Sequence, residues 1–146
     1  MNPHGVMKGI HQGFNPTQKV GGGVVFAVAA GAHVTFSSSF DYEHVHYQLD
    51  SKNNIPCSWS AKQNKVGEWI QVSQESPKNW LGIIIQGRGD LNQWVKTIRI
   101  TYTLDGQTWE SYGNGQIIQA NHDKDTKVDI HFNPIVYARA LRIYPH

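Results

Sequence analysis

The residues with the clearest binding chemistry lie in a polar turn, Gly87-Arg88-Gly89-Asp90, which interrupts an apolar part of the chain. The guanidinium of Arg88 donates in a fixed planar geometry, which suits two neighbouring hydroxyl groups of a sugar. Asp90 adds a carboxylate that accepts hydrogen bonds. The residues alone leave three interpretations open: a sugar-binding arginine, an Arg-Gly-Asp adhesion loop, or a turn closed by an internal ion pair.

Aromatic side chains outside the regular strand pattern would supply the second part of a sugar site. A sugar ring stacks its apolar face on an aromatic side chain, while its hydroxyls need carboxylates, amides or arginine. Tyr42, Trp59 and Trp80 fall at predicted strand ends or in loops, so they are the platform candidates, in competition with plain packing. The remaining tryptophans fall in strand register and are expected in the core: Trp69, Trp94 and Trp109.

Polar residues between positions 41 and 54 are the candidate partners of the sugar hydroxyls: Asp41, Glu43, His44, His46, Asp50 and Asn54. Two histidines that are two residues apart share one strand face, which is also the arrangement of a metal pair. Zinc needs three or four ligands and no third ligand appears at motif spacing, so a surface histidine pair is favoured. Acidic and carbonyl oxygens in this segment leave a structural calcium site open, and no other cofactor is expected.

A catalytic function has little support in the sequence. The chain shows no nucleophile elbow, phosphate-binding loop or HExxH motif. Asp41 and Glu43 are a carboxylate pair of the kind that glycosidases use, but nothing marks either one as buried. Cys57 has no base at a recognisable spacing, so it is interpreted as a free structural thiol. We therefore expect a binding protein rather than an enzyme.

Composition limits the remaining possibilities. A chain of 146 residues suits one domain, and a formal net charge of +2 without a basic run argues against nucleic acid as a partner. A single cysteine allows no internal disulfide, and no apolar run reaches transmembrane length. The first residues lack the pattern of a signal peptide. We expect a chain that stays in the cytoplasm or leaves by a non-classical route to act outside the cell, unless a signal has already been removed.

Strand signals dominate the coarse structure. Residues 81–85 form a short apolar run, and residues 94–104 alternate between two faces before the hairpin signal Asp105-Gly106. Turns are expected at residues 76–79 and at Asn133-Pro134. About eight short strands at this spacing predict an all-β fold, an antiparallel sandwich or barrel.

These stretches together resemble the discoidin domain, the family that includes the C-type domains of blood coagulation factors, with the closest likeness to slime-mould discoidins. The resemblance implies a jelly-roll β-sandwich, similar to galactose-binding domains, that binds glycans or lipid head groups through loops at one end and is not an enzyme. It favours sugar binding for Arg88, because it places the turn beside that loop end. The residues that carry it are the run 85–90, Trp94-Val95, the pattern 98–106 with Trp109, and the segments 37–40, 49–51, 67–72 and 132–145 with Trp59.

The resemblance divides the chain into an N-terminal extension, residues 1–23, and a discoidin-like domain, residues 24–146. The terminal cysteine pair of most secreted members is absent, and so is the last strand of the family's pattern. Residues 2–8 faintly echo that strand, and Gly21-Gly22-Gly23 would then be the joint of a circular permutation. A strand donated by a neighbouring chain, or no such strand, are the alternatives, since an unpaired sheet edge favours association.

The resulting hypothesis is a lectin-like module for galactose or N-acetylgalactosamine that acts in recognition or cell adhesion. Its expected partners are glycans, including those of cell-surface glycoproteins, and a homo-oligomer is expected because single sugar sites bind weakly. One alternative is a module for anionic phospholipid surfaces or for protein adhesion, with Val45, Ile55 and Trp80 at loop tips near Lys52 and Lys78. Another is a carbohydrate-binding module of a larger protein.

Overall fold

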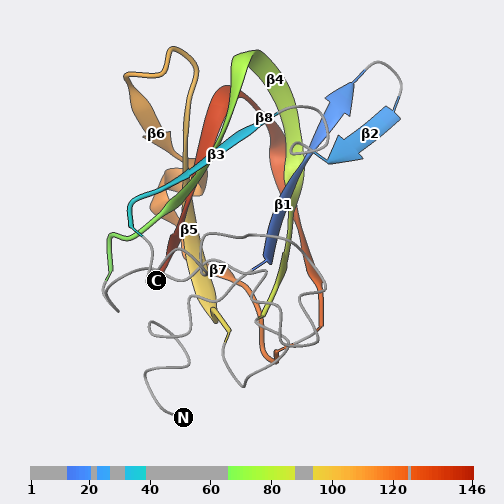
Figure 1. Cartoon of the computed structure of the whole chain (residues 1–146), viewed down its shortest axis with the longest axis vertical. Helices are drawn as coiled ribbons and strands as arrows, with labels where there is room; N and C mark the ends of the chain where they lie inside the picture. Colours follow the sequence, from blue (N-terminus) through green and yellow to red (C-terminus); the bar gives the residue numbers. More distant parts are fainter. Residues whose placement is uncertain (1–12, 21–22, 27–31, 39–65, 88–93, 125) are drawn as a thin grey trace.

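The computed structural model describes residues 13–20, 23–26, 32–38, 66–87, 94–124 and 126–146 (Figure 1). These residues form an all-β fold of antiparallel strands, as the sequence predicts. The strands are β1 (Gly13–Val20), β2 (Gly23–Phe26), β3 (His33–Phe36), β4 (Ile70–Gln86), β5 (Thr97–Thr103), β6 (Trp109–Ser111), β7 (Ile118–Gln119) and β8 (Val128–Pro145), with a short 3₁₀ turn, η3 (Tyr112–Gly115), after β6.

The long strands β4 and β8 hold the sandwich together. The strand order is β2-β1-β4-β8-β5-β6, while β3 pairs with β4 and β7 pairs with β5. The first part of β4, Ile70–Ser73, pairs with β3 and with the end of β8, which in turn pairs with β5. The last part of β4, residues 79–86, pairs with β1 and with the beginning of β8. The two parts of the β4–β8 pair therefore belong to the two layers of the sandwich, and Figure 1 shows β4 arching between them.

Two irregularities in the β4–β8 pairing accompany this bend. Four residues of β4, Gln74–Pro77, stand opposite Arg139 alone, and we call them the β4 excursion. Four residues of β8, Phe132–Ile135, stand opposite Leu81 alone, and we call them the β8 excursion. The two insertions lie on opposite strands and cancel, so the original register is restored beyond them. Extra residues in one strand of a pair increase the local bend and twist.

The core lies between the two layers and contains side chains from both. Ile70, Ile100 and Ile143 come from the part of the sheet around β5, while Trp80 and Ile83 come from the part around β1. All five are completely buried. The indole nitrogen of Trp80 donates to the carbonyl of Ala138 over 2.7 Å, so this large side chain is buried without an unpaired polar atom.

The outer face of the sheet formed by β3, β4, β8, β5 and β6 is polar and aromatic. The guanidinium of Arg142 lies between the rings of Trp69 and Trp109, 4.3 and 4.1 Å from their centroids, and its Nε donates to Gln71. The guanidinium of Arg99 lies 4.0 Å from the ring centroid of Tyr144. These cation–π contacts replace the apolar packing of the opposite face.

Several sequence-based expectations are wrong. Residues 76–79 and Asn133-Pro134 do not end strands, because both stretches lie within continuous strands. Pro77 and Pro134 fall in the two excursions, where proline is tolerated. Trp69 and Trp109 are half-buried on the outer face instead of in the core. The hairpin signal Asp105-Gly106 is confirmed, because it connects β5 to β6.

The N-terminal part of the chain contributes to the sheet. Strand β1, which falls within the predicted extension, pairs with β4 along most of its length. Residues 2–8, the candidate for a permuted strand, lie outside the described residues. The division at residues 23 and 24 and the circular permutation therefore stay predictions.

Candidate functional site

The candidate site is an open hollow of about 490 Å³ at the end of the sandwich where β4 ends and β5 begins. We call it the Trp94 hollow. In Figure 1 this end is at the bottom, away from the β4 arch. The residues that line it are Trp94, Lys96, Gln119, Asn121 and His122.

Backbone pairing brings two distant segments together around the Trp94 hollow. Strand β7 pairs with the beginning of β5, and the pairing continues as Ala120 N donates to the Lys96 carbonyl and Asn121 N to the Val95 carbonyl. Trp94 and Lys96 are two residues apart at the start of β5, so they share one face. The half-buried indole ring and the ammonium group therefore lie on the same wall of the hollow.

The side chain of Asn121 fixes the opposite wall. Asn121 is 3% exposed, and its amide nitrogen donates to the carbonyls of Ile85 and Thr126. The loop after it is closed by Asp123, whose carboxylate accepts from the backbone and the hydroxyl of Thr126. The exposed imidazole of His122 lies 3.5 Å from the same carboxylate. These bonds hold the 120–127 loop against the end of β4.

Gly87 allows this loop to approach. A Cβ atom at position 87 would meet the Asp123 carbonyl and the Lys124 Cα at 2.8 Å, and the Trp94 Cβ at 2.9 Å. Only glycine accommodates such short contacts without a movement of the loop or of Trp94. Gly87, the first residue of the predicted polar turn, therefore lies beside Trp94, while Arg88–Asp90 lie outside the described residues.

The hollow has the chemistry of a small-ligand site. It combines one aromatic ring with an ammonium group, an amide and an imidazole, which is the usual mixture for a polar ligand with an apolar face. The indole nitrogen of Trp94 is shielded from solvent and has no hydrogen-bond acceptor among the described residues. A buried donor without a partner is uncommon and calls for a water or a ligand group.

Only one of the predicted site residues is described by the structure, and its placement corrects the prediction. Trp80 lies inside β4, is completely buried and donates to Ala138, so it is a core residue and not a sugar platform or a membrane-inserting tip. The other candidates lie outside the described residues and stay predictions: Asp41, Tyr42, His44, His46, Asp50, Asn54, Trp59, Arg88 and Asp90.

Sequence reasoning missed most of the Trp94 hollow. It placed Trp94 in the core, and it did not select Lys96, Gln119 or His122. One signal was present: Lys96 interrupts an otherwise apolar face of the alternating stretch that begins with Trp94. A lysine in the register of core residues indicates that this end of the face reaches solvent.

The described residues contain no group of three or more histidine, cysteine or acidic side chains that could hold a metal ion. Within the same parts of the chain, no helix has the length and apolarity to cross a membrane.

Comparison with known proteins identifies the family. The F5/8 type C domain model matches residues 33–146. The chain belongs to the F5/8 type C (discoidin) domain family. The resemblance seen in the sequence is thereby confirmed, together with the discoidin-like β-sandwich.

Similar proteins include two from Dictyostelium discoideum. Discoidin-2 is 42% identical over 127 residues, which cover 80% of this chain and 49% of that protein. Discoidin-1 is 31% identical, with 79% of this chain and 44% of that protein covered. Lactadherin from Bos taurus is also 31% identical, and 74% of this chain matches 27% of that protein. The chain thus spans about half the length of the discoidins it matches, or less.

Solved structures give the same result for the fold. Wild-type discoidin II from Dictyostelium discoideum superposes with a TM-score of 0.74 at 33% identity, covering 82% of this chain and 50% of that one. The F5/8 type C domain of a Bacteroides fragilis protein has a TM-score of 0.60 at 13% identity, covering 80% of this chain and 82% of that one, and this match shows the fold alone. The family model, the relatives and the solved structures therefore agree on a discoidin domain fold for this chain.

Proposed function

We propose that this discoidin domain is a lectin-like module that binds galactose or N-acetylgalactosamine at the end of the sandwich that contains the Trp94 hollow. The observation that carries the proposal is the half-buried Trp94 ring, which lies among polar side chains and has an indole nitrogen without an acceptor among the described residues. The similarity to the Dictyostelium discoidins supports it independently.

The proposed mechanism is recognition in a largely preformed pocket. The apolar face of the sugar stacks on Trp94, and the indole nitrogen donates to one of its oxygens. Lys96 and Gln119 donate to further hydroxyls, and Gln119 also accepts from them. The guanidinium of Arg88 binds two vicinal hydroxyls, and Asp90 with acceptors from the 41–54 segment, such as Asp50 and Asn54, completes the site.

Calcium, partners and assembly are further parts of the proposal. A structural calcium ion would be bound by oxygens of the Asp41–Asp50 segment. The partners would be glycans of cell-surface glycoproteins, which the protein would bind outside the cell in recognition or adhesion. A homo-oligomer would hold several weak sites together and raise the overall affinity by orders of magnitude.

The test is a glycan array probed with the purified chain, with calcium and with a chelator. We expect binding to glycans with terminal galactose or N-acetylgalactosamine, and a loss of about tenfold or more in Trp94→Ala and in Arg88→Ala. Binding that is unchanged in the chelator would remove calcium from the proposal. A blank array from folded protein would contradict the lectin function itself.

Tyr137→Ala is the matched control for the loss of an aromatic side chain. Tyr137 is 57% exposed on β8 and does not line the Trp94 hollow. Its substitution should leave glycan binding within about twofold of the unchanged chain. An equal loss in Tyr137→Ala and Trp94→Ala would show that the effect does not come from the hollow.

The second candidate function is binding to an anionic membrane surface. The observation that favours it is the pairing of an ammonium group, Lys96, with a half-buried tryptophan in an open hollow at one end of the molecule. Such a pair suits the interface between lipid head groups and acyl chains. Co-sedimentation with vesicles that contain phosphatidylserine, undiminished by excess galactose, would favour this function over the lectin.

The third candidate is a carbohydrate-binding module of a larger protein. It is motivated by the coverage of about half of the discoidins' length. Sequencing of the full transcript would test this candidate. A second domain in the same reading frame would support it, and the absence of one would contradict it.

A further inference from the structure

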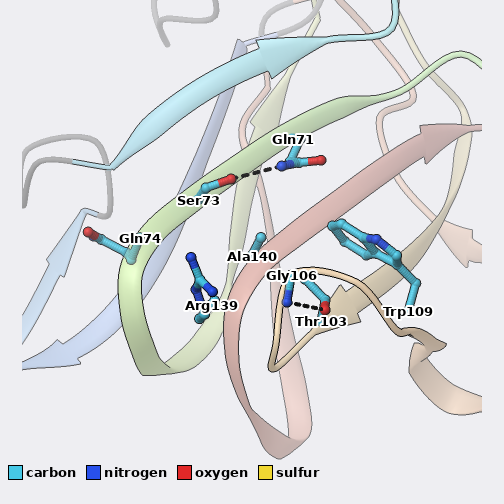
Figure 2. Close-up of a pocket in the computed structure, with 8 residues that line it drawn as sticks. All are labelled: Gln71, Ser73, Gln74, Thr103, Gly106, Trp109, Arg139 and Ala140. Atoms are coloured by element: carbon cyan, nitrogen blue, oxygen red, sulfur yellow. Dashed lines mark hydrogen bonds between the residues drawn. The ribbon is translucent and has the colours of Figure 1, made fainter.

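A second hollow lies on the outer face of the sheet, toward the end that carries the β4 excursion. It measures about 200 Å³, and we call it the Arg139 hollow. Figure 2 shows Arg139 between β4 and β8, with the β5–β6 hairpin on one side. The residues that line it are Gln71, Ser73, Gln74, Thr103, Gly106, Trp109, Arg139 and Ala140.

The irregular pairing of β4 and β8 creates this space. The β4 excursion leaves the sheet after Ser73 and rejoins it at Lys78, so Arg139 has no cross-strand partner on β4. The β5–β6 hairpin forms the facing wall and is held by its own turn. There, Thr103 Oγ1 accepts from Gly106 N, and the Asp105 carboxylate accepts from the backbone of Gln107 and Thr108.

The guanidinium of Arg139 is incompletely satisfied. A guanidinium has five N–H donors. One hydrogen bond from Arg139 is present, from Nη1 to the carbonyl of Asp105 over 3.3 Å. Its Nε is shielded from solvent and has no acceptor among the described residues. Leaving such a donor unpaired destabilises the protein, so an acceptor that enters the hollow beside it has a ready partner.

Neighbouring groups add donors and an aromatic wall. Gln71 donates through Nε2 to Ser73 Oγ over 2.9 Å, as Figure 2 shows, and this leaves the Ser73 hydroxyl hydrogen available for an acceptor. The half-buried ring of Trp109 lines the same hollow. An arginine, a hydroxyl and an indole therefore surround a space that is large enough for one charged group and part of a ring.

The charge of this face favours an anion. Three arginines lie on it, and none forms an ion pair with a carboxylate of the described residues: Arg99, Arg139 and Arg142. Two acidic side chains of the neighbouring segments do not line the hollow. Asp105 uses its carboxylate in the hairpin turn, and Glu75 is exposed in the β4 excursion and is not part of the lining. A planar oxyanion fits the fork of an arginine in a bidentate manner.

We propose that the Arg139 hollow binds the carboxylate of an acidic sugar residue, such as a uronic acid, as a second ligand site distinct from the Trp94 hollow. The carboxylate binds the Arg139 guanidinium and the Ser73 hydroxyl, and the sugar ring lies against Trp109. The choice of a saccharide rather than another carboxylate rests on the proposed lectin function and on the aromatic wall. Binding of the carboxylate itself rests only on the contacts of Arg139.

The test is a titration of the ¹⁵N-labelled chain with glucuronate, followed by NMR at the Nε–Hε signal of Arg139 and the indole N–H signal of Trp109. We expect both signals to shift with one common binding curve in the millimolar range. Glucose, the neutral counterpart, should shift neither, and acetate should bind at least about fivefold more weakly than glucuronate. No shift with glucuronate would overturn the proposal, and equal binding of acetate would overturn its assignment to a saccharide.

Variants link the shifts to the contacts. Arg139→Gln should weaken glucuronate binding about tenfold or more, and Ser73→Ala about two- to fivefold, measured at the Trp109 signal. Lys127→Gln removes the same charge at an exposed position near the other end of the sandwich, and it should change the affinity less than about 1.5-fold. Equal losses in Arg139→Gln and Lys127→Gln would show a general charge effect and contradict the site. If Arg139→Gln does not fold, Ser73→Ala and the titration of the unchanged chain still test the proposed site.

These experiments test the two proposed sites independently. Galactose is expected to shift the indole signal of Trp94 and to leave Arg139 unchanged. Loss of the galactose response with an intact glucuronate response would contradict the proposed function alone. The reverse result would contradict the Arg139 site alone.

Discussion

The β4 and β8 excursions have the same irregular backbone pairing but different side-chain contacts. Each places four residues of one strand opposite a single residue of the other. In the β8 excursion Phe132 is 5% exposed and packs on Tyr112 with a centroid distance of 5.0 Å, while Asn133, Pro134 and Ile135 line an open hollow of about 350 Å³. The Tyr112 hydroxyl also accepts from Asn133 N over 2.8 Å and lies 3.3 Å from the Asn133 carbonyl. The β4 excursion also borders a hollow, but the residue opposite it is the incompletely paired Arg139 instead of a packed ring.

The two excursions therefore differ in whether a buried ring anchors the irregular segment. Where a ring and a hydroxyl occupy the extra space, the irregularity contributes packing and hydrogen bonds to the native state. Where an incompletely paired arginine occupies it, the native state gains little and an acceptor can enter. We therefore expect stability to depend on the contacts of the β8 excursion and to tolerate changes at Arg139.

The largest effect is expected for Phe132→Ala in the β8 excursion. It removes a buried ring, so we expect a loss of about 3–5 kcal/mol in the free energy of unfolding, measured by urea denaturation. Ile135→Ala in the same excursion is the control, because Ile135 is 49% exposed and should cost about 0.5 kcal/mol or less. Similar losses in both variants would mean that the ring does not anchor the excursion.

Tyr112→Phe should have a smaller effect in the same place. It keeps the ring that packs on Phe132 but deprives the Asn133 N–H of its acceptor. We expect a loss of about 1–2 kcal/mol with an unchanged dependence of the unfolding free energy on urea. A variant as stable as the unchanged chain would show that packing alone holds the excursion.

Arg139→Met, on β8 opposite the β4 excursion, should change stability by less than about 1 kcal/mol. It loses the bond from Nη1 to the Asp105 carbonyl, but it also removes the unpaired Nε and keeps an apolar stem of similar length. Thermal and urea unfolding measure the difference. A loss of about 3 kcal/mol or more would mean that Arg139 is a structural anchor comparable to Phe132, and the contrast between the excursions would fail.

The smallest effect concerns Asp105 in the wall of the Arg139 hollow, and it depends on pH. Hydrogen bonds from the backbone N–H groups of Thr108 and Gln107 lower the pKa of Asp105 from its ordinary 3.8 to about 2. A lowered pKa means that the ionised carboxylate stabilises the folded state above pH 4, and this contribution is lost as the pH falls toward 2. The stability advantage over Asp105→Asn should therefore be constant above pH 4 and decrease between pH 4 and 2. An advantage that does not change with pH would contradict this role of the charge.

Local sequence patterns predicted where strands occur better than they predicted how far each strand continues. The alternation that ends in Asp105-Gly106 correctly predicted β5 and its hairpin, since both depend on neighbouring residues. The prolines at 77 and 134 indicated turns, because proline removes a donor from a regular ladder. In the structure, pairing between β4 and β8 accommodates both prolines in excursions. No local sequence signal indicates that the strand continues after the proline.

Burial was harder to predict because excursions change which face a side chain occupies. Trp80 follows the β4 excursion and points into the core, while Trp69 precedes it and lies on the outer face. Thr101 and Thr103 are 7% and 1% exposed although they alternate with the core residue Ile100. Thr101 and Thr103 lie on the same face as Trp109 and Arg142, which contact each other. This contact joins β6 and β8, so the spacing of residues within one strand does not predict it. The Trp94 hollow depends in the same way on β7 pairing with β5.

The pairing of β4 with β8 also determines when a nascent chain is able to fold. Ile70 pairs with Ile143 and Ile85 with Val128, so β4 lacks its main partner until the ribosome has released residues 128–145. Contacts between such distant segments are typical of slow-folding β proteins. Meanwhile the apolar run 81–85 has β1 as a partner on one edge only, and runs of this kind with an open edge associate readily with copies of themselves. Lys78 and Arg88, on either side of it, place charge where it opposes such association during synthesis.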